Sequence, residues 1–309
     1  MSGVVAAFAA LVSVAVLGYL IGRGGALRPT DERILSRLVF LVASPALLFT
    51  TVAKADLHLV FSTVMLTNVA GVLTVQVIFV LVATLVWRRS RAEATIGTLA
   101  ASYVNAGNLG IPIGVYVLGN GALIAPILLT QLLVLAPAAF LILDSSGERG
   151  PRRATVGTAL LRPLRNPLTV ASLLGLAIAA FGIDLPPLLL RPFELVGASA
   201  VPLALLAYGL SLSGTSRVLE EGNGPEITLI VILKEFVQPA VAYLVGRYAL
   251  GLDGPALLAS TLFAALPTAQ NIYVYSVHYR TATHLARSAV LLTTLVSVPV
   301  MTAISGLLG

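Results

Sequence analysis

Apolar stretches long enough to cross a lipid bilayer recur along the entire chain and constrain its fold more than any other feature. A helix of about 20 predominantly apolar residues spans the hydrocarbon core of a bilayer. This rule gives ten spans, at 3–22, 34–53, 60–87, 94–118, 122–143, 167–183, 193–213, 227–249, 255–278 and 286–307. Only 10% of the 309 residues are charged, whereas about a quarter of a soluble domain is charged. We therefore predict an all-α integral membrane protein with ten transmembrane helices.

Arginine and lysine are distributed unevenly between the connections that join these spans. Cytoplasmic loops retain an excess of positive charge, and 16 of the 19 basic residues fall in alternate connections. The other three are Lys54, Arg191 and Arg247. This pattern predicts a multi-pass protein of the cell membrane with both termini extracytoplasmic. The basic residues form short runs without an aromatic stacking platform, so no nucleic-acid partner is expected despite the net charge of +6.

Ten spans with both ends on one side divide naturally into two halves. We expect a first five-helix repeat at 1–143 and a second at 167–309. Because each half has an odd number of spans, the second must insert in the opposite orientation. Residues 144–166 form a predicted cytoplasmic loop that contains a short interfacial helix at 154–165.

Prolines fall at corresponding places in the two halves. Pro45 and Pro112 lie inside spans two and four, and Pro202 and Pro267 lie inside spans seven and nine. Proline removes a backbone donor and pushes the preceding residue out of the α region. A kink is the alternative outcome for any one proline. We predict that helices four and nine are both broken near the bilayer midplane, close to Pro112 and Pro267, and that they cross there.

Side-chain amides gather beside these expected breaks. They are Asn105, Asn108, Gln270 and Asn271. Amides are costly in hydrocarbon unless they line a cavity or satisfy freed backbone groups. Half-helix N-termini at the breaks would carry partial positive charge and unpaired N–H groups, which favour an anion such as a carboxylate. The alternative is that the amides only satisfy the broken backbone.

Three further polar residues lie at membrane depth. Gln131 in span five is a candidate substrate contact, or it bonds a neighbouring helix. Lys234 and Glu235 are adjacent opposite charges inside span eight. Lys234 either extends its ammonium to the interface or lies beneath the crossing, where it attracts an anion or replaces a coupling ion.

These residues resemble the auxin efflux carrier family, which includes plant PIN-type auxin transporters and bacterial permeases for malate and malonate. The resemblance rests on the segments 38–49 and 105–113, on Lys234 followed by Pro239, and on Pro267 with Asn271. It covers the whole chain. The chain lacks the long cytoplasmic loop of the plant members.

The resemblance implies a fold shared with sodium–bile acid symporters and sodium–proton antiporters. Helices 1, 2, 6 and 7 would form a scaffold, and helices 3–5 and 8–10 a transport domain that moves in an elevator-like manner within a homodimer. By position, Asn108 and the break around Pro267 and Asn271 would hold a substrate carboxylate, with Ser44 facing them from the scaffold.

The sequence therefore predicts a secondary transporter of a small organic anion in the lipid bilayer. A sodium-coupled bile-acid-type symporter, or a non-transporting sensor or channel of the same fold, is the alternative, and coupling to Na⁺ or H⁺ stays open. We expect no cofactor and no bound metal. An enzyme is not expected, because the chain has no cysteine and every Asp falls in or beside a loop.

Overall fold

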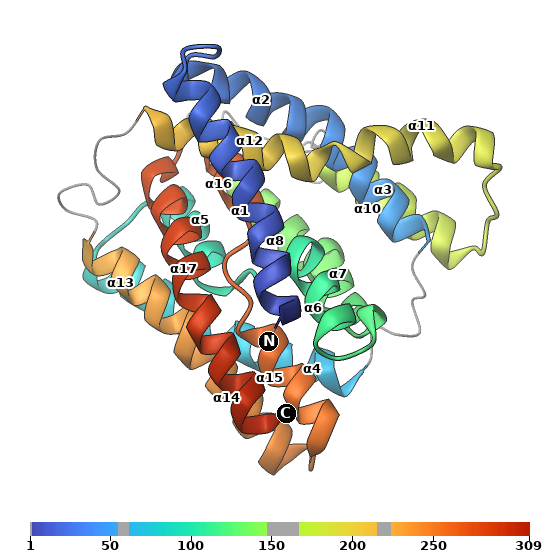
Figure 1. Cartoon of the computed structure of the whole chain (residues 1–309), viewed down its shortest axis with the longest axis vertical. Coiled ribbons are helices and arrows are strands. Elements are labelled where there is room, and N and C mark those ends of the chain that lie inside the picture. Colours follow the sequence, from blue (N-terminus) through green and yellow to red (C-terminus); the bar gives the residue numbers. More distant parts are fainter. Residues whose placement is uncertain (1, 55–61, 147–166, 215–223) are drawn as a thin grey trace.

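The computed structural model describes residues 2–54, 62–146, 167–214 and 224–309, and most of them are helical (Figure 1). The first-half helices are α1 (Ser2–Arg23), α2 (Glu32–Leu38), α3 (Ser44–Ala53), α4 (Thr63–Leu81), α5 (Arg91–Ser102), α6 (Ile111–Tyr116), α7 (Ala125–Thr130) and α8 (Ala136–Ser145). They are followed by α10 (Pro167–Ala180), α11 (Pro187–Ala198), α12 (Ala200–Ser213), α13 (Gly224–Ile232), α14 (Gln238–Leu244), α15 (Gly254–Ala264), α16 (Asn271–Tyr279) and α17 (Thr283–Leu308). The predicted interfacial helix at 154–165 lies outside the described residues.

Each predicted span overlaps one or more of these helices. Within the described ranges, six stretches are long and apolar enough to cross a membrane. They are Glu32–Ala53, Thr63–Val86, Ala125–Ser145, Pro187–Ser213, Gly224–Ala249 and Thr283–Leu308. The fold is thus all-helical and typical of an integral membrane protein, as predicted. The count of ten spans and the inverted repeat stay predictions.

Short π-helical turns join several of these helices into longer ones. Four of them, η2 (Val39–Ala43), η5 (Ala106–Gly110), η7 (Gln131–Leu135) and η9 (Leu233–Val237), each end two residues before a proline. A proline nitrogen cannot bond the carbonyl four residues earlier. The wider π turn lets a later N–H reach the carbonyls of that turn, so the helix continues past the proline.

The helices of the predicted scaffold pack closely on one another. α1 lies against α12, where a Cβ on Gly209 would come within 1.9 Å of the Ala15 carbonyl oxygen. Small residues of this kind allow two membrane helices to approach closely. α3 packs against α10 and α11, and Figure 1 shows these three projecting to one side of the molecule.

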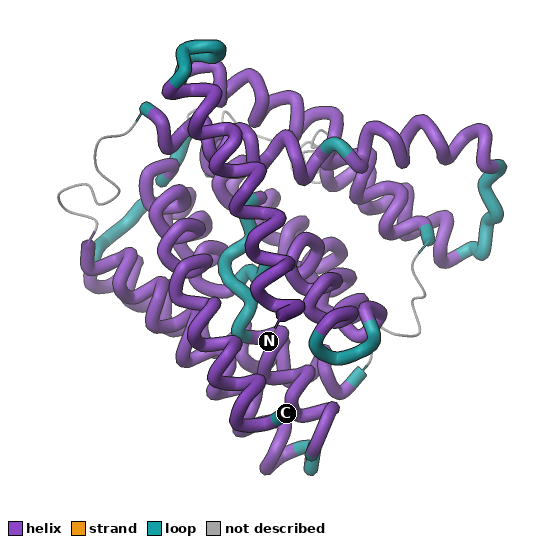
Figure 2. Tube along the Cα trace, in the orientation of Figure 1, coloured by secondary structure: helices purple, strands orange, loops and turns teal. Residues whose placement is uncertain are grey.

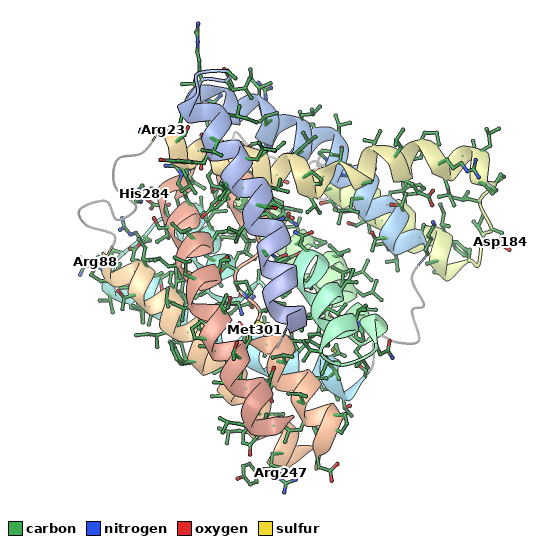
Figure 3. All side chains as sticks on the ribbon, in the orientation of Figure 1. Arg23, Arg88, Asp184, Arg247, His284 and Met301 are labelled. Atoms are coloured by element: carbon green, nitrogen blue, oxygen red, sulfur yellow. The ribbon has the colours of Figure 1, made fainter. Side chains whose placement is uncertain are left out.

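The other helices pack mainly among themselves. α4 contacts α5, α14 and α15, and α17 contacts α13, α15 and α16. Many large apolar side chains face outward, including Leu85 at 70% exposure and Tyr248 at 77%. An apolar outer surface of this kind suits a lipid environment. Figure 3 shows Arg247 at the opposite end of the molecule from Arg23, in keeping with the predicted separation of their two loops.

Candidate functional site

Two helical stretches are interrupted, and the interruptions cross. α5 ends at Ser102 and helix resumes at Ala106, while α15 ends at Ala264 and α16 begins at Asn271. The extended residues between them pair in an antiparallel bridge, Val104 with Thr268. Figure 2 shows this non-helical chain in the centre of the molecule. The prediction of two breaks agrees with this geometry, although the first lies ahead of Pro112, which falls inside α6.

Backbone hydrogen bonds join the two interrupted segments directly. The Asn105 N–H donates to the Pro267 carbonyl at 2.8 Å, and the Ala269 N–H donates to the Tyr103 carbonyl at 3.1 Å. These bonds satisfy groups that the broken helices leave without intrahelical partners. The crossing is therefore a structured element with a defined geometry.

Four polar side chains form three hydrogen bonds that reinforce the crossing. Asn105 Nδ2 donates to Gln270 Oε1 at 3.0 Å, and Gln131 Nε2 donates to the Val104 carbonyl at 2.9 Å. Thr268 Oγ1 donates to the Ala100 carbonyl at 2.6 Å. For Asn105, Gln131 and Gln270, the amides thus bond the broken backbone or each other, as in the alternative set out above, although Gln270 Nε2 has no partner within the described residues. Gln131 bonds a neighbouring segment.

A cavity of about 160 Å³ lies beside the crossing. Five of the residues singled out from the sequence line it: Ser44, Asn105, Asn108, Gln131 and Asn271. Ser44 comes from α3, and Ala200 and Val201 from α12, so predicted scaffold helices close one wall. Pro112, Pro267 and Gln270 are not part of this lining. Pro267 and Gln270 instead take part in the crossing.

The side chains of Asn108 and Asn271 differ from the other amides. Both are half-buried and line the cavity, and neither side chain forms a hydrogen bond with the described part of the chain. The backbone N–H groups of Gly107, Asn108 and Asn271 likewise have no acceptor within the described ranges. They lie in the first turns of two half-helices, where the macrodipole adds partial positive charge. The side-chain amides and backbone N–H groups that line the cavity can therefore donate several hydrogen bonds to one anion.

The C-terminal ends of the preceding half-helices meet a buried cation. Lys234 Nζ donates to the carbonyl of Ala264, the last residue of α15, and to Gln238 Oε1, both at 3.0 Å. Gln238 Nε2 in turn donates to the carbonyl of Ser102, the last residue of α5, at 3.2 Å. Lys234 has 0% exposure, which agrees with the second of its two alternatives and not with an ammonium that extends to the interface. It lies under the crossing instead.

Gln238 was not singled out from the sequence, although its position one helical turn after Lys234 places the two side chains together. Glu235 is also fully buried. Neither of its carboxylate oxygens has a hydrogen-bond partner within the described residues. Neither charge lines the cavity, which is bounded by amides, the hydroxyl-bearing side chains of Ser44, Thr51 and Tyr103, backbone and apolar side chains.

Comparisons with known proteins agree on one class. The sequence profile of the family described as "Membrane transport protein" matches residues 3–305. The chain is 27% identical over 277 residues to a Rhizobium meliloti (strain 1021) protein named "Putative malonate transporter", covering 87% of this chain and 85% of that one. It is 26% identical over 289 residues to the Escherichia coli (strain K12) "Uncharacterized transporter YfdV", covering 88% of each.

A plant relative matches over a shorter region. "Probable auxin efflux carrier component 5c" of Oryza sativa subsp. japonica is 30% identical over 167 residues. This match covers 53% of the present chain and 45% of the rice protein. The similarity to the bacterial relatives therefore extends over most of both chains, whereas the similarity to the rice protein is partial.

Proposed function

Because this chain belongs to the auxin efflux carrier family of membrane transport proteins, we propose that it carries a small carboxylate across the membrane and binds it at the helix crossing. The observation that carries this proposal is the set of unused donors around the central cavity. The cavity is lined by Asn108 and Asn271, whose amides are unused, and by first-turn residues of two half-helices. A carboxylate accepts several hydrogen bonds at once and favours such positive helix ends.

The size of the cavity supports a small substrate. Its volume of about 160 Å³ is below the range of roughly 300–1,000 Å³ typical of sites for drug-sized ligands. The name of the Rhizobium relative points to malonate, a dicarboxylate of this class. We take malonate as the first ligand to test.

The proposed transport cycle is of the elevator type. Helices 1, 2, 6 and 7, which include α1–α3 and α10–α12, form the scaffold, and the remaining helices carry the site past it. The close packing within each group supports this division. Ser44 faces the site from the scaffold side, so its contact with the substrate changes as the two bodies move. Lys234, a buried cation beneath the crossing, replaces a coupling ion in this scheme.

The proposal includes a homodimer in the cell membrane with both termini extracytoplasmic. α11 supports the dimer because it projects from the molecule (Figure 1) and exposes Leu188 at 83% and Leu195 at 78%. An exposed apolar helix of this kind suits a partner subunit or lipid. The proposed partner is a second copy of the chain.

The test combines binding and exchange on purified protein. Malonate affinity is measured by calorimetry, and exchange of labelled for unlabelled malonate by counterflow in proteoliposomes. Asn108→Ala and Asn271→Ala should each weaken binding by about 1–3 kcal/mol, because each removes a half-buried donor to the anion. Asn108→Asp should weaken it further, since it places a negative charge against the carboxylate.

Asn68→Ala is the matched control. Asn68 is a buried amide of α4 that does not line the cavity, so its removal should leave malonate affinity unchanged. All variants are compared after they elute as monodisperse protein. If Asn108→Ala and Asn271→Ala bind and exchange malonate as the parent does, the crossing is structural and the proposed site is wrong.

A further inference from the structure

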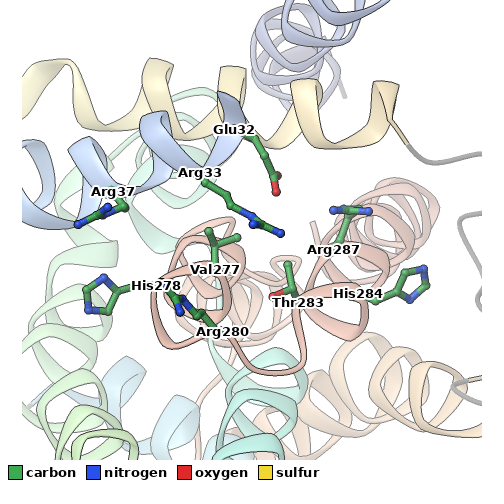
Figure 4. A pocket seen from close by; sticks show the side chains of 9 residues that line it. All are labelled: Glu32, Arg33, Arg37, Val277, His278, Arg280, Thr283, His284 and Arg287. Carbon is green, nitrogen blue, oxygen red and sulfur yellow. The ribbon is translucent and has the colours of Figure 1, made fainter. Parts of the chain in front are cut away.

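A second and larger cavity lies between α2 and the α16–α17 hairpin. Its volume is about 770 Å³, nearly five times that of the cavity at the crossing. Among the described residues, these two parts of the chain line it, with Glu32, Arg33, Arg37, Val277, His278, Arg280, Thr283, His284 and Arg287 (Figure 4). α2 belongs to the predicted scaffold and the hairpin to the predicted transport domain. A ligand in this cavity would contact both.

The cavity is strongly basic. Four arginines against one glutamate leave three net positive charges when the histidines are neutral. Arg33, Arg37 and Arg280 form no salt bridge within the described residues, where the ion pairs are Lys54 with Glu194 and Arg89 with Glu226. Figure 4 shows Glu32, Arg33 and Arg287 pointing toward one another across the cavity. Several guanidinium groups are thus held close together without a matching number of anions.

The start of α17 adds to this positive potential. Thr283 and His284 are the first two residues of this 26-residue helix, and its N-cap, Ala282, offers no side-chain acceptor. The first N–H groups of a long helix favour an anion. Here they lie beside the arginines in the same cavity.

Aromatic side chains pack against His278 at the border of this cavity. Phe40 stacks on His278 with ring centroids 3.6 Å apart and contacts Tyr275 edge to face. Phe140 packs against the same Tyr275 at 4.9 Å. Phe40 and Tyr275 are buried, and the two cavities share no lining residue. The basic cavity is therefore a separate space from the proposed carboxylate site.

We propose that the basic cavity binds an anion carrying two or more phosphate groups, which bridges α2 and the α16–α17 hairpin and slows their relative movement. Guanidinium groups match phosphate oxygens in paired hydrogen bonds, and a diphosphate balances three positive charges better than a single carboxylate. A soluble diphosphate and the headgroup of a two-phosphate lipid share this chemistry. The effect on transport rests on the proposed function, whereas the binding does not.

Inorganic pyrophosphate is the probe for the first test. Its binding to purified protein in uncharged detergent is measured by calorimetry. We expect Arg33→Gln and Arg280→Gln each to weaken pyrophosphate binding by about tenfold or more, because each removes charge-assisted hydrogen bonds. Arg247→Gln is the matched control, since Arg247 is exposed at the far end of the molecule (Figure 3), and it should leave the affinity unchanged. Absence of binding, or equal effects of all three variants, would overturn the proposal.

A second arm distinguishes the two sources of phosphate. Pyrophosphate binding is repeated in phosphatidylcholine nanodiscs with and without cardiolipin, whose headgroup carries two phosphates. If pyrophosphate binding is lost in cardiolipin nanodiscs, and this loss depends on Arg33, the lipid is identified as the occupant. Unchanged binding identifies a soluble ligand. Either result supports the cavity as a diphosphate site.

Counterflow tests the consequence for transport. Pyrophosphate should slow malonate exchange in the parent and not in Arg280→Gln. The rate of malonate exchange without pyrophosphate is also measured for Arg33→Gln and Arg280→Gln. If each variant slows this exchange by the same factor by which it weakens pyrophosphate binding, the cavity is part of the substrate path and the proposal fails. If malonate is not transported at all, the proposed function fails while the calorimetric test of the cavity still stands.

Discussion

Replacing Lys234 by methionine tests how much the buried ammonium contributes to the crossing. Methionine keeps an unbranched stem but removes the cation, so the bonds to the Ala264 carbonyl and to Gln238 Oε1, both 3.0 Å long, are lost. Each such bond from a charged donor contributes about 1.5–3 kcal/mol. The desolvation of the ammonium, which opposes this, is lost as well. Removing the ammonium leaves these two buried neutral acceptors unpaired, which costs about 1–3 kcal/mol each, and we expect a loss of about 3 kcal/mol.

Thermal unfolding of the purified protein is the assay. At about 2 °C per kcal/mol for a chain of this size, Lys234→Met should lower the melting temperature by about 6 °C. Arg247→Met is the control on the same predicted span. Arg247 is exposed, so its replacement should change stability by no more than about 0.5 kcal/mol. A Lys234→Met protein that melts with the parent would refute the reasoning.

The same variants report on transport. Because Lys234 and Gln238 together hold the C-terminal ends of both α15 and α5, loss of the cation should also reduce malonate counterflow by about tenfold or more. Lys234→Arg should restore it only partly, since a planar guanidinium differs from an ammonium in shape and hydration. Full activity of Lys234→Met would leave Lys234 without a role in the cycle.

Two further predictions concern the amides and the topology. Asn105→Ala should destabilise the fold by about 1–3 kcal/mol, because it removes the hydrogen bond between the side-chain amides of Asn105 and Gln270 across the crossing. Asn108→Ala should melt close to the parent. Equal melting temperatures of the two variants would contradict this distinction. Since the chain has no cysteine, Gly121→Cys and Gly182→Cys should react with an impermeant thiol reagent added outside intact cells, and Ser146→Cys should not. External labelling of Ser146→Cys would reverse the predicted orientation.

Local patterns in the sequence predict the helical segments and the existence of two breaks, because length, apolarity and amide placement are local properties. They place the first break less well. Pro112 lies inside a continuing half-helix, where the π turn at 106–110 accommodates it, whereas Pro267 lies in the extended crossing and accepts a hydrogen bond there. Similar spacing of the prolines therefore does not give them equivalent roles.

Which amides bond other residues and which face the cavity depends on tertiary structure. Asn105 and Asn108 stand in one motif, yet Asn105 is used by Gln270 from the other break while Asn108 faces the cavity. The basic cavity could likewise not be predicted from the sequence. The charge pattern placed Arg33 and Arg280 on one side of the membrane, but only the packing of α2 against α16 brings them to one cavity.

The antiparallel bridge at the crossing has a local twofold axis between Val104 and Thr268. Rotation about this axis exchanges Tyr103 with Pro267 and Asn105 with Ala269, and so exchanges the two backbone hydrogen bonds. In the predicted inverted repeat, a substrate arriving from either side of the membrane would therefore meet much the same backbone. The sense of transport must then come from what is not duplicated. Lys234 is such an element, since α4, which lies in the span that the predicted repeat pairs with span eight, carries no charged residue.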